Sequence, residues 1–431
     1  MRTVKAAIAS IVFLFVFASH LLAATVQVGT CRPSVSSFAT IQAAVNASSP
    51  GGTVLVCPGT YPEQVAIDKA LNILGAQSGT EKAAIIVAPA GGIVQNTTSL
   101  SSGNPIAAQI LVTNATGVNI SNLTVDGANS QVSVSGCTPV NLVGVLYQNA
   151  SGTLNHLAVI NQALTGVSIG CQSGLGIFVQ SGNSGTSNVS IVNNYVENYQ
   201  KNGITANEAG TTVTITANNV VGQGPTTGAA ENSIQVGFGA AGTVRGNVAM
   251  DDVFSPDTIS SPGKAASGIL VFASTGVTVA NNTVGNTQFG IAFVSDATAG
   301  PADSGTIEGN RISATHVFDG VELCGSSNTV TGNTISGSDE SGVHIDSSCG
   351  AAASNTVSNN TINDACAGIL VGTGAGSNTI GTNNFYNTRN TTLTADTCTP
   401  LLTAAARAST ATHLAAASAT ANHARPSPAR P

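Results

Sequence analysis

Charged residues are scarce in this chain of 431 residues. Asp, Glu, Lys and Arg together make up 8% of the sequence, and tryptophan does not occur, whereas charged residues make up about a quarter of a typical soluble domain. So few charges exclude charged surface helices and coiled coils, whose exposed faces carry Glu, Lys and Arg. The net charge of −7 includes no basic cluster, so nucleic acid and anionic membrane surfaces are not expected as partners.

Long apolar runs are absent beyond the N-terminus. Hydrophobic residues make up 42% of the chain and are dispersed among polar residues, so the chain is too apolar to be disordered and has no internal membrane span. Residues 1–24 begin with two basic residues, continue with an apolar run of 13 residues from Ala6 to Ala18, and end with Ala23 and Ala24. This order is typical of a secretory signal peptide, and the run is shorter than the roughly 20 residues that cross a bilayer, which argues against a retained anchor. We predict a protein that is secreted, periplasmic or at the cell surface, without membrane contact after cleavage.

A short sequence pattern recurs along the chain. It consists of an apolar residue, two polar or small residues, Asn, any residue and a second apolar residue, as in the segment from Val330 to Ile335. In most copies a Gly before Val or Ile follows about 8 to 10 residues later, as at Gly342. Two short alternating strands per repeat predict the coil of a solenoid, in which each strand pairs in parallel with its counterpart one layer, about 4.8 Å, away.

The recurring asparagines are expected to stack on one another in such a solenoid. An inward Asn at a turn can bond backbone groups and the amides above and below it, so its role is structural. The predicted ladder consists of Asn194, Asn218, Asn247, Asn282, Asn310, Asn333, Asn360 and Asn383.

These patterns resemble the parallel β-helix repeat of the pectin-lyase-like superfamily over roughly residues 38–390, and the segments 38–45 and 52–61 are similar to the opening of pectinesterase-like β-helices. The resemblance implies an all-β fold, a right-handed parallel β-helix solenoid, which we assign to residues 25–398. Ile41, Ala44 and Val45 fall on one helical face, so a short N-terminal helix is expected to cap the first coil. Residues 399–431 are rich in Ala, Thr and Pro and lack strand alternation, which predicts a disordered tail.

The eight cysteines do not show the CxxC or Cys/His spacing of zinc sites. In an exported chain an even number of cysteines indicates disulfides, although the sequence leaves their connectivity open. Consecutive cysteines are 26, 34, 25 and 32 residues apart when taken in pairs, and a spacing of about one repeat would bring each pair within bridging distance on neighbouring layers. These pairs are Cys31 and Cys57, Cys137 and Cys171, Cys324 and Cys349, and Cys366 and Cys398.

The catalytic motifs of the superfamily are not recognisable here. The pectinesterase segments Gln-Asp-Thr and Asp-Phe-x-Phe-Gly do not occur, and of the polygalacturonase motifs only a paired acid, Asp251 and Asp252, is present. Pectate lyases need Ca²⁺-binding carboxylates and basic residues, but residues 120–385 contain only four Lys or Arg residues. That shortage argues against tight binding of acidic polysaccharides and leaves a neutral glycan or an unusual active site.

One group of titratable residues stands out. Alignment of the Gly positions places Glu322 and His344 at the same outward position on neighbouring coils, and Asp319 and Asp346 lie close by in sequence. Glu322 and His344 could form a general acid/base pair, with Asp319 and Asp346 as binding residues, or the group could hold a cation such as Ca²⁺. The alternative is a cross-strand salt bridge on a solvated face. No other cofactor is indicated, and no metal ligand set is assigned.

A second candidate is the long insertion from Met250 to Lys264. It carries Asp251 and Asp252 as further catalytic candidates and Asp257 and Lys264 as binding candidates. Loops that leave a solenoid on one side often build its binding groove, whereas the alternative is a solvated surface loop.

Three functional hypotheses follow from these features. The leading one is a secreted, monomeric β-helix protein that engages extracellular polysaccharide along its lateral groove, as carbohydrate-active members of the superfamily do. The second is a non-enzymatic surface, adhesion or structural protein. The third, a polysaccharide lyase, epimerase or glycoside hydrolase, would require a new site around Glu322 and His344, because fold alone assigns no reaction.

Overall fold

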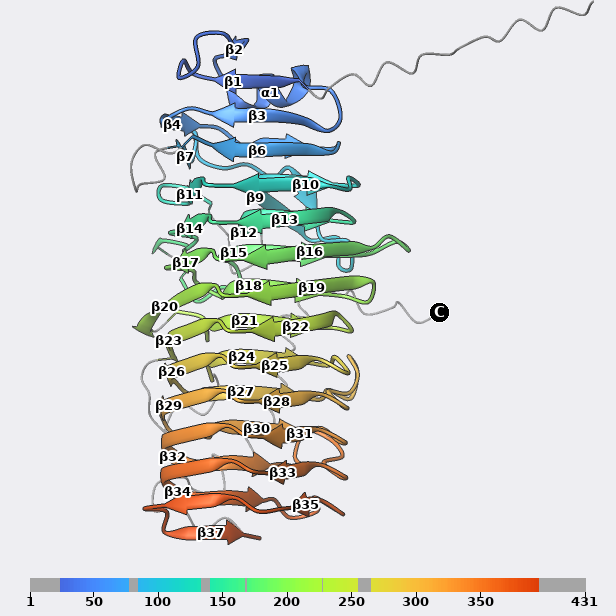
Figure 1. Cartoon of the computed structure of the whole chain (residues 1–431), viewed down its shortest axis with the longest axis vertical. Helices are drawn as coiled ribbons and strands as arrows, with labels where there is room; N and C mark the ends of the chain where they lie inside the picture. The colour runs from blue at the N-terminus through green and yellow to red at the C-terminus, as the bar shows by residue number, and fades with distance from the viewer. Residues whose placement is uncertain are drawn as a thin grey trace, which may run out of the picture.

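The computed structural model describes residues 24–76, 84–132, 140–166, 169–226, 228–254 and 265–394. Their strands stack as the coils of one long solenoid with a helix at its N-terminal end (Figure 1). The prediction of an all-β parallel β-helix with a short N-terminal helix is therefore confirmed. No helix in the described ranges is long and apolar enough to cross a membrane. Outside these ranges lie the predicted tail, the predicted signal peptide except Ala24, and Cys137, Cys398, Asp257 and Lys264.

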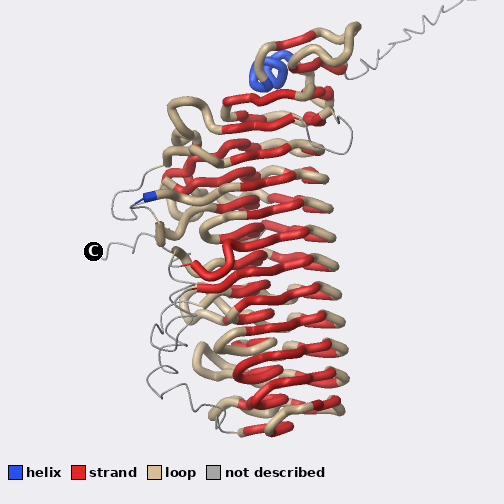
Figure 2. The backbone as a smooth tube through the Cα atoms, turned by 90° about the vertical axis from the view of Figure 1, so that its left-hand side faces the viewer, coloured by secondary structure: helices blue, strands red, loops and turns tan. Residues whose placement is uncertain are grey.

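The strands form three rows that run along the solenoid axis (Figure 2). The first row is a separate sheet, in the spatial order β2 (Ser37–Phe38), β1 (Thr25–Val28), β3 (Gly52–Val56), β6 (Leu71–Gly75), β10 (Val118–Ser121), β13 (Ser151–Asn155), β16 (Ser187–Val192), β19 (Thr211–Thr216), β22 (Ala241–Arg245), β25 (Thr278–Ala280), β28 (Thr306–Glu308), β31 (Thr329–Thr331), β33 (Thr356–Ser358) and β35 (Thr379–Ile380).

The other two rows belong to a second sheet. The row that follows the first sheet along each coil contains β4 (Gly59–Pro62), β7 (Ala84–Val87), β11 (Thr124–Asp126), β14 (Ala158–Ile160), β17 (Tyr195–Glu197), β20 (Asn219–Thr226), β23 (Val248–Phe254), β26 (Thr283–Thr287), β29 (Arg311–Thr315), β32 (Thr334–Ile345), β34 (Thr361–Val371) and β36 (Asn384–Tyr386). The last row contains β5 (Val65–Ile67), β9 (Pro105–Thr113), β12 (Asn141–Gln148), β15 (Leu175–Gln180), β18 (Asn202–Asn207), β21 (Asn232–Gly237), β24 (Ser267–Phe272), β27 (Phe289–Val294), β30 (Val321–Cys324), the ends of β32 and β34, and β37 (Asn390–Leu393). The short strand β8 (Thr97–Thr98) pairs antiparallel with β9.

Parallel pairing in register places equivalent side chains above one another. Val244 in β22 pairs with Ile215 on one side and Val279 on the other, and all three are fully buried. The alternate residues of β19, Thr212 and Thr214, face solvent. The alternation of apolar and polar residues therefore builds a continuous apolar core inside the coils.

The eight recurring asparagines lie at the turn between the first sheet and the second row, where they form a hydrogen-bonded ladder. Asn310 is representative: its Oδ1 accepts bonds from the backbone N and the Nδ2 of Asn282, both at 2.9 Å. Its own Nδ2 donates to the carbonyl of Val279 at 3.0 Å and to Asn333 Oδ1 at 2.9 Å. The same hydrogen bonds recur in successive coils and satisfy the polar groups that are buried at these turns.

The glycine of the second pattern is required by a close approach between coils. A Cβ atom on Gly320 would lie 2.4 Å from Ile335 Cγ2 and 2.8 Å from the carbonyl oxygen of Gly342. Gly342 meets Ile362 and Gly368 in the same way. Since these contacts involve core side chains and backbone of the next coil, a larger residue does not fit there.

The N-terminal helix α1 (Ile41–Ala47) begins three residues later than the expected segment 38–45. Thr40 caps it, because the Thr40 side chain accepts a hydrogen bond from the helix backbone at 3.1 Å. Ile41, Ala44 and Val45 are buried, as predicted.

Two of the expected disulfides lie fully within the described residues. Cys31 is bonded to Cys57 with a Cα separation of 5.6 Å, and Cys324 to Cys349 with a separation of 5.7 Å. Cys171 and Cys366 are also disulfide-bonded.

Candidate functional site

Glu322 and His344 occupy the same register position on successive coils. Glu322 lies in β30 and His344 at the end of β32, and the two residues are paired partners across the parallel ladder. Their neighbours Val321 and Val343 point into the core, so Glu322 and His344 point away from it. His344 Nδ1 lies 3.2 Å from Glu322 Oε2.

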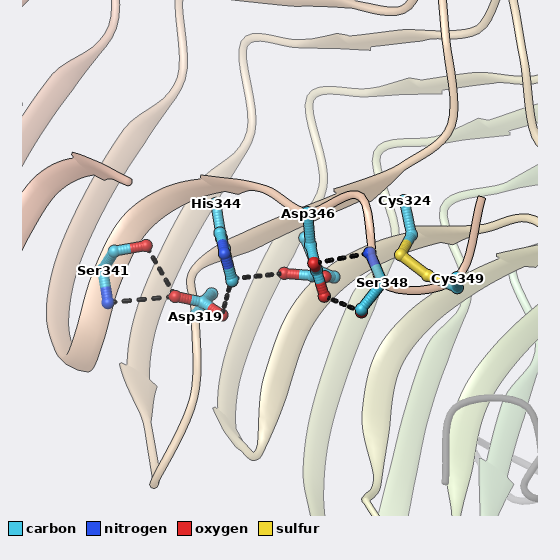
Figure 3. Close-up of polar contacts among 8 residues, drawn as sticks. Asp319, Cys324, Ser341, His344, Asp346, Ser348 and Cys349 are labelled. Atoms are coloured by element: carbon cyan, nitrogen blue, oxygen red, sulfur yellow. Dashed lines mark hydrogen bonds and ion pairs between the residues drawn. A yellow bond between two sulfur atoms is a disulfide. The ribbon is translucent and has the colours of Figure 1, made fainter. Parts of the chain in front are cut away.

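Asp319 completes this acid–histidine cluster, which we define as Asp319, Glu322 and His344. Its Oδ2 lies 3.4 Å from the same His344 Nδ1. Its Oδ1 accepts hydrogen bonds from Ser341, at 3.0 Å from the backbone N and 2.6 Å from the hydroxyl (Figure 3). Ser341 stands directly before the repeat glycine Gly342. Its place in the repeat therefore positions the two donors that orient the Asp319 carboxylate.

The cluster is buried although it faces away from the core. The Asp319 and Glu322 side chains are 1% and 2% exposed, and His344 is 13% exposed. The alternative prediction, a salt bridge on a solvated face, is therefore correct about the ion pair and wrong about its solvation. The two carboxylates are almost inaccessible to solvent. The sequence pattern shows which residues stack, but not what covers the outer face.

Burial and charge shift both ionisation equilibria of the pair. Burial raises the pKa of Glu322 to about 8, and the neighbouring His344 opposes that rise. For His344, burial lowers the pKa, but Glu322 and Asp319 outweigh it and hold the pKa well above its ordinary value. The pKa values of both groups are therefore raised, and such perturbed values are frequent at functional sites.

Asp346, the second predicted binding residue near this cluster, is oriented differently. Its carboxylate accepts hydrogen bonds from the backbone N of Ser348 at 2.8 Å and from the Ser348 hydroxyl (Figure 3). Its charge still contributes to the raised pKa of Glu322. Asp346 also lies near the sulfurs of Cys324 and Cys349, but these form a disulfide and offer no thiolate.

Asp252 belongs to a second buried cluster. Its carboxylate accepts hydrogen bonds from the Tyr199 hydroxyl at 2.7 Å and the Ser233 hydroxyl at 2.5 Å. Burial raises the pKa of Asp252 to about 8 and that of the nearby Glu231 to about 10, and the Asp252 charge adds to the second shift. Glu231 Oε2 accepts one hydrogen bond, from the backbone N of Gln223 at 2.9 Å.

Sequence analysis missed Tyr199, Glu231 and Ser233. One signal was available: Ser233 stands between Asn232 and Ile234, where other coils carry the glycine of the second pattern. Its hydroxyl reaches Asp252 from that position.

Asp251, next to Asp252, lies within strand β23 and not in the predicted loop. Its backbone has a φ of 65°, and its carboxylate accepts a hydrogen bond from Asn286 Nδ2 at 2.6 Å. Asp251 therefore lies at a local irregularity of the strand, where its carboxylate links two coils.

The two clusters do not share one site. The register runs from Asp252 through Thr287 to Thr315, and β30 with Glu322 follows on the same coil as Thr315. Asp252 and Glu322 are thus two coils apart, roughly 10 Å along the axis. The acid–histidine cluster is therefore the candidate site on the outer face, and Asp252 lies within a separate internal network.

Comparisons with known proteins identify the fold. Among solved structures, GH136 lacto-N-biosidase from Eubacterium ramulus is similar with a TM-score of 0.56 and 11% identity, over 84% of this chain and 68% of that chain. The A-module of mannuronan C-5 epimerase AlgE4 from Azotobacter vinelandii has a TM-score of 0.47 and 13% identity, over 82% of this chain and 92% of that module. The protein is a parallel β-helix of the pectin-lyase-like fold, which it shares with the GH136 lacto-N-biosidase.

The sequence comparisons match a shorter part of the chain. Residues 224–400 match the family model described as periplasmic copper-binding protein (NosD). Curated proteins give no match to the chain. The match to a family model described as periplasmic, together with the disulfides, confirms the prediction of a location outside the cytoplasm.

The described residues do not fit a Cu⁺ site. Cu⁺ prefers cysteine thiolates and methionine thioethers. The six cysteines within the described ranges are all disulfide-bonded, and Met250 is the one methionine of the sequence besides Met1. The acid–histidine cluster instead offers nitrogen and oxygen donors.

Proposed function

We propose that this chain is an exported, monomeric β-helix protein that engages extracellular polysaccharide on the outer face of its third strand row, around Asp319, Glu322 and His344. The observation that carries the proposal is the acid–histidine cluster itself. It concentrates buried polar groups on a face that points away from the core, in a chain with few charges.

Aromatic side chains beside the cluster support a sugar ligand. Phe289 and Phe318 stack with ring centroids 4.5 Å apart and an interplanar angle of 7°. Phe318 immediately precedes Asp319, and the backbone N of Gly290, next to Phe289, donates to the Asp319 carbonyl at 3.1 Å. Ligand sites typically combine apolar and aromatic walls with a few placed polar groups. Phe289 is buried, so the half-buried Phe318 is the ring of this pair that a sugar could contact.

The charge distribution favours a neutral glycan. Asp319 and Glu322 bring two carboxylates to the cluster, and basic residues are sparse along the repeat. A polyuronate would meet like charge there, whereas a neutral sugar would not be repelled.

Binding and turnover can be measured on the same panel. The mature chain is tested against neutral and acidic polysaccharides for retention and for reducing-end and unsaturated products. We expect retention by a neutral polysaccharide, weakened at least tenfold by Phe318→Ala and by His344→Ala. The control His156→Ala alters an exposed turn histidine and should bind as the wild type does. Failure of the folded protein to bind any member of the panel would overturn the proposal.

The second candidate, a non-enzymatic structural or adhesion protein, is favoured by the burial of the cluster. Asp319 and Glu322 are nearly inaccessible, and a buried ion pair can serve the fold alone. On this account His344→Ala lowers stability and leaves the binding properties unchanged.

A further inference from the structure

The geometry points to a binding site for a divalent first-row metal ion of the Zn²⁺ type, which we propose is formed by His344 Nδ1, Asp319 Oδ2 and Glu322 Oε2. This inference goes beyond the proposed engagement of polysaccharide, and neither requires the other.

The separations of the three donor atoms fit a shared ion better than they fit hydrogen bonds. His344 Nδ1 lies 3.4 Å from Asp319 Oδ2 and 3.2 Å from Glu322 Oε2. Charge-assisted hydrogen bonds are about 2.7–2.9 Å long, so both contacts are longer than such bonds. Ligands placed tetrahedrally at about 2.0–2.2 Å from a Zn²⁺ ion lie roughly 3.4 Å apart. All three atoms lie within 4.8 Å of one another.

The carboxylates are held with their free oxygens toward this point. Ser341 occupies Asp319 Oδ1 through two hydrogen bonds of 3.0 and 2.6 Å, which leaves Oδ2 facing His344. Such outer contacts orient metal ligands in known sites. Glu322 Oε2 is buried and receives no hydrogen bond of good geometry from the described residues. Its nearest polar contact is His344 Nδ1 at 3.2 Å, so one imidazole serves two buried carboxylates, and a divalent ion would compensate both charges.

The donor set selects among cations. Ca²⁺ takes six to eight oxygen ligands at longer distances, and Mg²⁺ keeps most of its waters. One imidazole and two carboxylates suit Zn²⁺ and similar ions. Three protein ligands would leave a fourth position open, as in catalytic zinc sites, and His344 at 13% exposure is the most accessible of the three.

The test uses the full mature chain, stripped with a chelator and titrated calorimetrically with ZnCl₂, CaCl₂ and MgCl₂. We expect Zn²⁺ to bind and to raise the thermal midpoint, while Ca²⁺ and Mg²⁺ in the same range do not bind. His344→Ala and Glu322→Gln should each weaken Zn²⁺ binding at least tenfold. The matched controls His156→Ala and Glu308→Gln, which lie away from the cluster, should leave it unchanged.

A second variant keeps the proposal open to refutation if His344→Ala fails to fold. Ser341→Ala removes only the hydroxyl that orients Asp319, and it should weaken Zn²⁺ binding about 10- to 100-fold. The proposal is overturned if the folded wild type does not bind Zn²⁺, or if Glu322→Gln and Ser341→Ala bind it as tightly as the wild type. Polysaccharide retention is measured separately on the metal-free protein, so the two proposals can fail independently.

Discussion

His344 stacks directly on Glu322 from the next coil of the solenoid, with His344 Nδ1 3.2 Å from Glu322 Oε2 and both residues largely shielded from water. Asp319 reaches the same nitrogen. Two carboxylates therefore depend on one imidazole for compensation, and each substitution in the group should show a different stability effect.

Loss of the imidazole should cost more than loss of one carboxylate charge. His344→Ala leaves Asp319 and Glu322 buried side by side, and removal of one partner from a buried pair costs about 3–5 kcal/mol. Glu322→Gln keeps Asp319 paired with His344, so we expect a smaller loss. The free energies of unfolding from denaturant titrations of the single and double variants measure both effects. Equal losses would show that the two carboxylates do not compete for His344.

Stability should fall as the pH rises from about 5 to 9. Asp252 and Glu231 have pKa values raised mainly by burial, to about 8 and about 10, whereas the unfolded chain releases these protons near pH 4. The folded state thus binds more protons over this range, so higher pH favours unfolding until the folded pKa values are passed. The charged groups around this pair are Asp251, which raises the pKa of Asp252, and Lys201, which lowers that of Glu231.

Asp252→Asn isolates this contribution. The amide can still accept the hydrogen bond from Tyr199 but does not ionise, so the thermal midpoint of the variant should depend less on pH. Glu308→Gln, on the first sheet, should keep the wild-type slope. If the thermal midpoint of Asp252→Asn depends on pH as strongly as that of the wild type, Asp252 is not a source of the pH dependence.

The asparagine ladder should contribute more in the interior of the solenoid than at its end. Asn310→Ala removes four hydrogen bonds and leaves the backbone N of Asn282 and the carbonyl of Val279 without these partners, at about 1–3 kcal/mol for each buried group. Asn383→Ala at the half-buried end of the ladder should cost less. The comparison of the two free energies of unfolding tests the ladder, and a larger loss in Asn383→Ala would refute this account.

Close packing at the glycine positions gives a further prediction. Gly342→Ala places a Cβ 2.4 Å from Ile362 Cγ2 and 2.8 Å from the Gly368 carbonyl, so overpacking should destabilise the protein by about 1–3 kcal/mol. Gly91→Ala meets no atom within 4 Å and serves as the matched control. Similar thermal midpoints for the two variants would contradict the packing account.

The repeat could be predicted from the sequence because its Asn and Gly residues recur at short, local spacings. The Asn and Gly spacings predict the coils, and their alignment predicts that Glu322 stacks on His344. Burial of that pair was not predictable, since the pattern carries no information about what covers the outer face. The contacts of Asp252 were missed because Tyr199 and Ser233 lie 53 and 19 residues away from it, across coils whose loops differ in length.

Asp319, Glu322 and His344 should form the centre of a ligand-binding surface. Affinity electrophoresis of the wild type, Phe318→Ala, His344→Ala and His156→Ala through gels containing each polysaccharide tests it most directly. We predict that a neutral polysaccharide retards the wild type and His156→Ala, and that Phe318→Ala and folded His344→Ala bind it at least tenfold more weakly. Equal retardation of all four proteins, or free migration of the wild type in every gel, would contradict the claim.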